Sequence, residues 1–297
     1  MVWCSGWELA SAVSNSGGLG LIGAGSMHPD TLTTHIKKCR DATTNPFGVN
    51  VPLMYPEIEK IMNIIIDEGV KIVFTSAGNP ATWTRFLKDN GITVVHVVAN
   101  TKNVVKCNES GVDAIVAEGF EAGGHNGREE TTTLTLIPHV RSVTDLPLIA
   151  AGGIGSGRAM LAAFALGAEG VQIGSRFAAT MESSAHPEFK MKIVSAKEGD
   201  TLLTLKKLVP VRLLRNKFFD EINTAQSSGA GIPELSKLLG KGRARLGMFE
   251  GNIDDGELEI GQVSAMINEI QPAAQVLLEI VSEYTEIKKK LCGKEDW

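Results

Sequence analysis

The sequence has few aromatic residues and no strong cluster of charge of either sign. Aromatic residues make up 5% of the chain, which argues against a stacking platform for single-stranded nucleic acid. The net charge is −5, and the longest basic run is 288–290. Because nucleic-acid binding leaves a basic footprint, this composition excludes a nucleic-acid partner. We interpret the basic run as the solvated C-terminal end of a helix.

Cysteine is also scarce, and no hydrophobic run is long. Cys4, Cys39, Cys107 and Cys292 lie far apart, in no CxxC or metal-ligand spacing. Free thiols of this kind are typical of a reducing compartment. No apolar run reaches the roughly 18–20 residues that a membrane span needs, and the N-terminus lacks a signal-peptide pattern. The sequence therefore predicts a cytoplasmic protein that contacts no membrane.

What the sequence does contain is a regular alternation of short apolar runs with segments of helical periodicity. Near-continuous apolar runs indicate strands that are buried on both faces, as in a parallel sheet covered by helices. Their alternation with helices predicts right-handed crossovers and an α/β fold. The runs are 20–22, 47–51, 71–74, 93–98, 114–117, 148–151 and 170–173.

We expect these elements to form a TIM-type (β/α)8 barrel, although the pattern gives one strand fewer than such a barrel needs. Residues 7–15 have the pattern of a first helix, so a strand is expected before them. We therefore expect the first strand to be absent or reduced to a stub at residues 1–3. The opening should then lie between the strands near Leu21 and Ile173, because a closed barrel pairs every strand on both sides.

Beyond the last strand signal the pattern changes, since leucines mix with basic residues and glycines interrupt charged segments. We assign residues 200–257 to a helical insertion that covers the active site. The barrel keeps residues 1–199 and 258–297, with two closing helices expected at about 258–269 and 272–290.

Two glycine-rich loops follow the last two strand signals. Gly152 and Gly153 follow the run 148–151, and Gly174 and Ser175 follow the next run. Glycines let backbone N–H groups approach an anion, and the helix after each loop adds the positive end of its dipole. In βα barrels, the loops after strands seven and eight often bind phosphate. We therefore predict a phosphate site here, and glycines that only make tight turns are the alternative.

The same stretch contains part of a dinucleotide-binding fingerprint, at Gly153 and Gly155. However, Arg158 occupies the position of the last glycine, and the next strand does not end in Asp or Glu. A Rossmann fold is therefore disfavoured.

His125 gives the sharpest indication of catalysis. It lies among the glycines of the segment 122–127, after a strand that ends at Glu118, and we expect this loop to be flexible. Active sites of βα barrels lie at the carboxyl ends of the strands. Because imidazole titrates near neutrality, we predict that His125 acts as a general base or hydrogen-bond donor, and a packed or surface histidine is the alternative. No metal site is predicted, since no metal-ligand spacing is found for His28, His35, His96, His139 or His186.

At these residues the chain resembles the nitronate monooxygenase (2-nitropropane dioxygenase) family, which includes the FMN-dependent enoyl-ACP reductase II. The similarity runs from residue 1 to about residue 262. Family members carry a first strand that ends in Gly-Gly-Met, of which this chain keeps only Met1. The matching segments are AVSNSGGLG (12–20), PFGVN (46–50), EAGGH (121–125), AAGGI (150–154), QIGSRF (172–177) and ESSAHP (182–187).

The resemblance implies an oxidoreductase that binds FMN without a covalent link, with His125 at the position of the family's catalytic histidine. The residues implied to hold the FMN phosphate are Gly152, Gly153, Gly174 and Ser175. Those implied to lie along the ribityl chain and the ring are Met1, Asn50, Glu118 and Gln172. Gly123 and Gly124, next to the histidine, are also assigned to the cofactor.

Three interpretations of the activity stay open. Our first interpretation is a nitronate monooxygenase, which would oxidise an alkyl nitronate with O2 to a carbonyl compound and nitrite. The second is an enoyl-ACP reductase II, which would take electrons from NAD(P)H and reduce an enoyl thioester. The third is a flavin-binding protein without turnover. The expected partner is a small molecule, and a homodimer stays open because the sequence does not determine the number of subunits.

Overall fold

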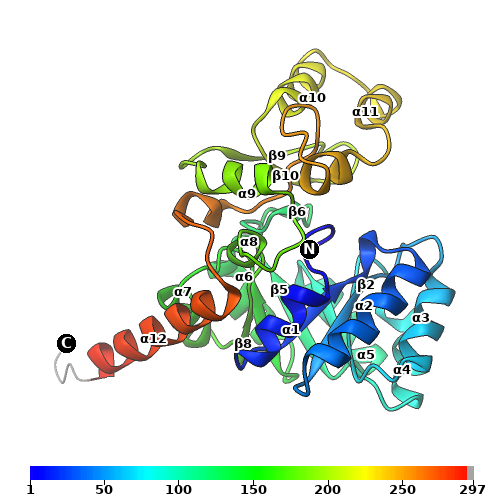
Figure 1. The fold of residues 1–297 in the computed structure, drawn as a ribbon, viewed down its shortest axis with the longest axis vertical. Helices are drawn as coiled ribbons and strands as arrows, with labels where there is room; N and C mark the ends of the chain where they lie inside the picture. The colour runs from blue at the N-terminus through cyan, green and yellow to red at the C-terminus, as the bar shows by residue number, and fades with distance from the viewer. Residues whose placement is uncertain (293–297) are drawn as a thin grey trace.

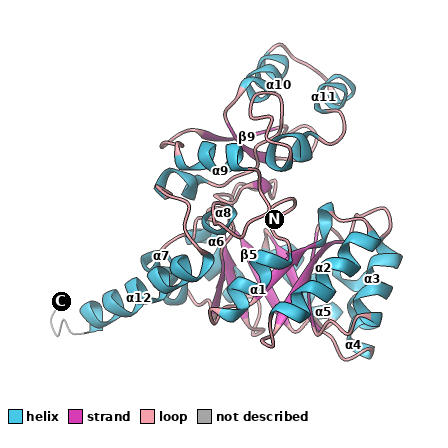
Figure 2. Cartoon of the chain, in the orientation of Figure 1, coloured by secondary structure: helices cyan, strands magenta, loops and turns pink. Residues whose placement is uncertain are grey.

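The computed structural model describes the backbone of residues 1–292 and the side chains of residues 1–291. Its body is a curled, seven-stranded parallel sheet in the order β1-β2-β3-β4-β5-β7-β8, surrounded by helices (Figures 1 and 2). Each strand predicted from an apolar run is confirmed. The strands are β1 (Gly20–Gly23), β2 (Phe47–Pro52), β3 (Ile72–Ser76), β4 (Thr93–Val98), β5 (Ala114–Glu118), β7 (Leu148–Ala151) and β8 (Gly170–Gln172).

Burial of both faces explains why these strands are apolar throughout. Successive residues of a strand point to opposite faces of the sheet. Val73 and Val94 point outward and pack beneath the helices, whereas Phe74 and Val95 point inward and fill the centre of the curl. We call the inward set, formed by Phe74, Val95, Val116 and Ala151, the inner core.

The helices agree in most places with the pattern in the sequence. Ser156, predicted as an N-cap, accepts a hydrogen bond from the backbone N–H of Ala159 at 3.2 Å. None of the described helices combines the length and the hydrophobicity that a membrane span requires. The helices of the body are α1 (Trp7–Asn15), α2 (Pro29–Ala42), α3 (Ile58–Asp67), α4 (Thr84–Asp89), α5 (Thr101–Ser110), α6 (Thr133–Arg141), α7 (Gly157–Ala165), α8 (Ser175–Ala178) and α12 (Ala273–Cys292). The helix α9 (Pro187–Val194) lies above this body and packs with Leu214 and Met248 of the insertion (Figure 1).

The basic run lies at the C-terminal end of a helix, as predicted, and three of the cysteines are free thiols. Lys289 and Lys290 occupy the last turn of α12. Cys4, Cys39 and Cys107 are free thiols in buried positions. The prediction for the thiol of Cys292 lies outside the described side chains.

The parallel sheet stays open in the described residues, with β1 and β8 at its edges, which is where the strand count placed the opening. Residues 1–3 form a turn and pair with neither edge. An apolar cluster that includes Leu9 of α1, Met160 of α7 and Val276 of α12 covers this side of the molecule. Because α12 packs against both α1 and α7 (Figure 1), one helix spans the opening from the outside.

The insertion is not purely helical, so this part of the prediction is wrong. It begins with an antiparallel hairpin of β9 (Thr201–Thr204) and β10 (Val211–Leu214), followed by α10 (Lys217–Ser227) and α11 (Ile232–Leu239). All four residues of β10 are buried, in part against Phe218 and Ile222. A short run of leucines mixed with basic residues fits a strand as well as a helix, and tertiary packing decides between them.

A third strand joins this hairpin from the body of the molecule. β6 (Gly124–His125) follows β5 along the chain and pairs with β10, which gives a second sheet in the order β6-β10-β9. We call it the upper sheet, since it lies above the parallel sheet in Figure 1.

The prediction of a helix at 258–269 is also wrong, because the segment begins with extended backbone. Glu259 bridges to Leu213 beside β6, and Leu258 accepts a hydrogen bond from the backbone N–H of Leu214 at 2.8 Å. Leu258 and Ile260 are buried and alternate with glutamates, which is the period of a strand. Only a short 3-10 turn, η4 (Gln262–Met266), follows.

Candidate functional site

Three polar residues of the predicted site project into the curl of the parallel sheet. Asn50 lies in register with Phe74, and both Glu118 and Gln172 lie in register with Ala151. Phe74 and Ala151 belong to the inner core, and residues in register point to the same face. The structure thus brings Asn50, Glu118 and Gln172 to the carboxyl end of the inner core.

Glu118 has a shifted pKa, and Gln172 has an unpaired hydrogen-bond acceptor. Burial raises the pKa of Glu118 to about 7. The Oε1 atom of Gln172 is buried and has no hydrogen-bond partner among the described residues. Leaving a buried acceptor unpaired costs about 1–3 kcal/mol. A ligand N–H or O–H at this point would remove that penalty.

The glycine loops predicted to bind phosphate lie at the same end of the sheet. Gly152 and Gly153 have φ angles of +89° and +66°, and a Cβ at Gly152 would lie 2.5 Å from a backbone oxygen. In the described residues, the backbone N–H groups of Gly152, Gly153 and Gly174 donate to no protein acceptor. Ser175 Oγ accepts from the N–H of Gly261 at 2.9 Å, so its own hydroxyl hydrogen remains available.

The start of α7 does not contribute to this site, contrary to our expectation. Glu283 of α12 accepts hydrogen bonds from the backbone N–H groups of Gly157 at 2.8 Å and Arg158 at 3.4 Å. A Cβ at Gly157 would lie 2.2 Å from the backbone N of Tyr284, so glycine also allows the two helices to touch. A carboxylate therefore already occupies the positive end of this helix dipole. The N–H groups of the loops themselves remain for an anion.

Met1 lies at the opening of the parallel sheet, next to one of these loops. A Cβ at Gly23, at the end of β1, would lie 2.7 Å from the backbone oxygen of Met1. A Cβ at Gly174, beyond the end of β8, would lie 3.7 Å from its Sδ atom. Met1 therefore lies beside the predicted phosphate loop, and the contact with the ribityl chain or the ring that the resemblance implied for it stays a prediction.

His125 is placed by the upper sheet, not by the parallel sheet. It pairs with Val211 of β10, and Gly124 pairs with Arg212. Its side chain is exposed. The prediction of a loop is wrong at this residue, because His125 belongs to a short strand.

A side chain at Gly123 or Gly124 would collide with the neighbouring segment of the protein. A Cβ at Gly123 would lie 2.4 Å from the backbone of Ile260, and one at Gly124 would lie 2.6 Å from a carboxylate oxygen of Glu259. The loop before His125 thus packs directly on the extended segment at 259–260. Contact of these two glycines with a cofactor stays a prediction.

Arg212 is the main residue of this region that the sequence analysis missed. It is 2% exposed, and burial lowers its pKa. Its Nε and Nη2 atoms donate to the carbonyl oxygen of Phe120 at 3.1 and 2.9 Å, and Nη1 donates to that of Thr201 at 3.2 Å. The only available signal was a single arginine within the apolar run Val-Arg-Leu-Leu.

Comparison with known proteins identifies the family of this chain. The nitronate monooxygenase family model matches residues 1–63 and 56–283. The chain belongs to the nitronate monooxygenase family. It is 30% identical to a probable nitronate monooxygenase of Staphylococcus aureus, over 94% of this chain and 91% of that protein. The resemblance found in the sequence is therefore confirmed.

Two solved structures resemble this chain over almost its whole length. FabK from Thermotoga maritima is 42% identical, with a TM-score of 0.93 over 99% of this chain and 93% of that one. Nitroalkane oxidase from Streptomyces ansochromogenes is 27% identical, with a TM-score of 0.83 over 97% of this chain and 94% of that one. Of these two structures, FabK is the one with the higher sequence identity to this chain.

Proposed function

We propose that this protein is an FMN-dependent oxidoreductase that uses NAD(P)H to reduce an enoyl thioester, as an enoyl-ACP reductase II of the FabK type. The observation that carries the proposal is 42% identity to FabK over 99% of the chain, against 27% to the nitroalkane oxidase. This comparison favours the reductase over the nitronate oxidation that we placed first from the sequence.

The residues at the carboxyl end of the parallel sheet fit FMN in their chemistry. The free backbone N–H groups of Gly152, Gly153 and Gly174, with the hydroxyl of Ser175, form a donor set suited to one phosphate. The unpaired Oε1 of Gln172 suits a ring N–H or a ribityl hydroxyl. When bound, FMN supplies hydride transfer between the nicotinamide and the substrate.

His125 supplies the proton chemistry in this proposal. Reduction of an enoyl thioester adds a hydride to the β-carbon and a proton to the α-carbon, and a hydrogen-bond donor to the carbonyl oxygen stabilises the negative charge that develops between these two steps. The imidazole of His125 is exposed, so a substrate that arrives from solvent can reach it. We therefore assign to His125 an N–H that is directed at the thioester.

An anaerobic titration of the FMN-loaded protein tests the proposal. NADH or NADPH should bleach the flavin absorbance, and crotonyl-CoA should then restore it in the absence of O2. Bleaching by an alkyl nitronate, with no response to either nicotinamide, would overturn the proposal in favour of nitronate oxidation. No response to any of these compounds would leave a flavin-binding protein without turnover, which also contradicts the proposal.

A further inference from the structure

The loop that carries His125 connects two sheets. It leaves the parallel sheet at the end of β5, passes through Phe120 and enters the upper sheet at Gly124. The backbone N–H of Asn126 then donates to the carbonyl oxygen of Pro210 at 2.9 Å, which extends the pairing with β10. The position of His125 therefore depends on how this loop is fixed between the two sheets.

Arg212 fixes the loop at its point of departure. Two of its N–H groups converge on the carbonyl oxygen of Phe120, and the guanidinium stacks on the Phe120 ring at 4.6 Å. A third N–H reaches Thr201 of β9. One buried side chain thus connects the loop to both strands of the hairpin.

The nearby acidic groups are engaged elsewhere, so Arg212 acts on the backbone. The carboxylate of Glu121 accepts the N–H of Thr133 at 3.0 Å. Glu130 forms an ion pair with Lys206. Arginine has a planar fork of donors that can hold carbonyl oxygens in two directions, whereas lysine has a compact ammonium on a flexible stem.

The ladder places Arg212 and His125 on opposite faces of the upper sheet. Arg212 lies directly opposite Gly124, and His125 lies directly opposite Val211. In an antiparallel pair, opposed residues share a face and the next pair takes the other face. The guanidinium therefore holds the loop from the buried side and leaves the imidazole exposed on the other.

We propose that Arg212 is a positioning residue, which fixes the carbonyl of Phe120 and thereby sets the place at which β6 presents His125. The proposal rests on the proposed function only for the role of His125 in turnover. The placement of the loop follows from the contacts of Arg212 alone. Arg212 is not itself assigned any contact with the substrate.

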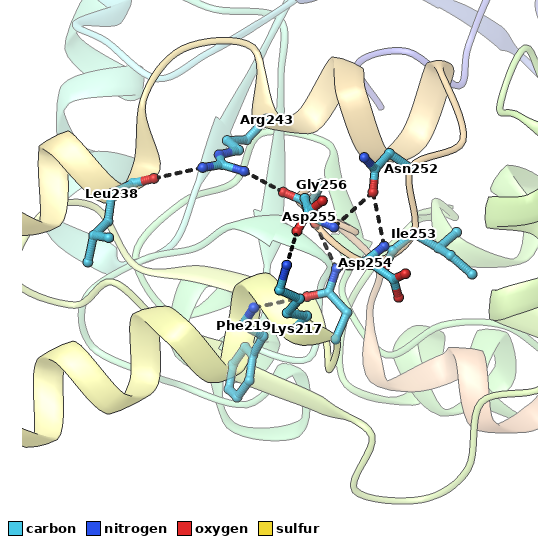
Figure 3. A network of polar contacts seen from close by, with 10 residues as sticks. Lys217, Phe219, Leu238, Arg243, Asn252, Ile253, Asp254, Asp255 and Gly256 are labelled. Atoms are coloured by element: carbon cyan, nitrogen blue, oxygen red, sulfur yellow. Dashed lines mark hydrogen bonds and ion pairs between the residues drawn. The ribbon is translucent and has the colours of Figure 1, made fainter.

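Arg243 is a matched control within the same insertion. It donates to the carbonyl oxygens of Asp255 at 2.8 Å and Leu238 at 3.3 Å (Figure 3). Its guanidinium also lies over the ring of Phe218 at 4.9 Å. Its chemistry matches that of Arg212, because both arginines bind carbonyl oxygens and an aromatic ring. Its partners all lie in the insertion, and none lies in the His125 loop.

The experiment compares Arg212→Lys and Arg212→Met with Arg243→Lys and Arg243→Met, each with and without His125→Ala. A displacement of about 1 Å can lower a rate by about 100-fold. We expect the Arg212 variants to lower kcat by about 10- to 100-fold with little change in KM. In the His125→Ala background the same substitutions should give no further loss, because residues that act as one unit are not additive.

Amide hydrogen exchange gives a readout that does not need turnover. Arg212→Lys should accelerate exchange at Asn126, whereas Arg243→Lys should leave it unchanged. Equal loss of kcat in both arginine series, or full multiplication of the Arg212 and His125 effects, would overturn the proposal. If His125→Ala leaves turnover unchanged, the role of His125 in the proposed function fails, and exchange at Asn126 still decides the role of Arg212.

Discussion

The parallel sheet and the upper sheet differ in how far apart along the chain their partners lie. In the parallel sheet, strands follow chain order and each is reached from the last by one crossover. In the upper sheet, Val211 pairs with Thr204 on one side and with His125 of a distant loop on the other. The glycine loops with their free N–H groups follow strands of the parallel sheet, whereas His125 lies in the upper sheet. The two halves of the site should respond separately to substitution.

The largest effect should come from the histidine itself. His125→Ala should leave FMN bound and lower turnover of an enoyl thioester by about 10²–10⁴-fold, the usual contribution of a positioned acid–base group. FMN affinity should stay unchanged because the side chain is exposed on the upper sheet. Steady-state kinetics and flavin fluorescence measure the two quantities. Loss of FMN together with activity would mean that His125 and the glycine loops do not respond separately to substitution.

Two glycine substitutions test the two halves of the site one at a time, Gly123→Ala in the His125 loop and Gly153→Ala in a glycine loop. Gly123→Ala forces a Cβ into the backbone of Ile260 and should lower turnover by about 100-fold through displacement of the loop, with FMN retained. Gly153→Ala, at φ +66°, should instead weaken FMN binding, with a backbone cost of about 1–2 kcal/mol. FMN titration and turnover at saturating FMN separate the cases. Release of FMN by Gly123→Ala would show that Gly123 contacts the cofactor.

Two carboxyl groups have raised pKa values, that of Glu118 in the parallel sheet and that of Glu257 in the insertion. Burial raises the pKa of Glu118 from 4.5 to about 7. In the insertion, burial and then Glu259 raise that of Glu257 from 4.5 to about 8. Between the unfolded and folded values the folded state binds the extra proton, so stability falls as pH rises.

Thermal melts of the FMN-free protein across this pH range test these shifts. Glu118→Gln should gain stability relative to wild type as pH rises from 4.5 to about 7, and Glu257→Gln should continue to gain up to about pH 8. The exposed Glu198→Gln serves as the control and should run parallel to wild type. Parallel melting curves for all three variants would contradict both shifts.

The smallest effect concerns the contact between α7 and α12. Glu283→Gln should destabilise the protein by about 0.5–1 kcal/mol, the usual value of an anion at a helix N-terminus. FMN affinity should not change, because Glu283 occupies the helix end and not the glycine loops. Arg158→Gln, which removes only the partly exposed ion partner of Glu283, should have a smaller effect. A change in FMN affinity with Glu283→Gln would show that the start of α7 does contribute to the phosphate site.

The sequence predicted the parallel sheet because each of its strands carries its own signal. Runs such as Thr93–Val98 are apolar on both faces, and their crossovers fix the order of the strands. The roles of Asn50, Glu118 and Gln172 were implied by the family resemblance and not by this pattern, and the structure places all three in strands of the parallel sheet.

The upper sheet could not be predicted in this way. β6 has only two residues, which is too short for any periodicity, and it exists because β10 lies beside it. Arg212 and Glu283 act on loops far away along the chain, and such contacts leave no local pattern. The alternation at 257–260 is the one signal that was readable and was assigned to a helix instead.

The position of α12 over the opening has a consequence for biosynthesis. The ribosome makes α12 after every element that it covers, so Leu9, Met160 and Phe177 have no apolar cover while those elements emerge. Exposed apolar surface on a nascent chain is what chaperones recognise and what drives aggregation. A chain that stops before residue 273 should therefore be held by chaperones or aggregate, even though every strand of both sheets has already been translated.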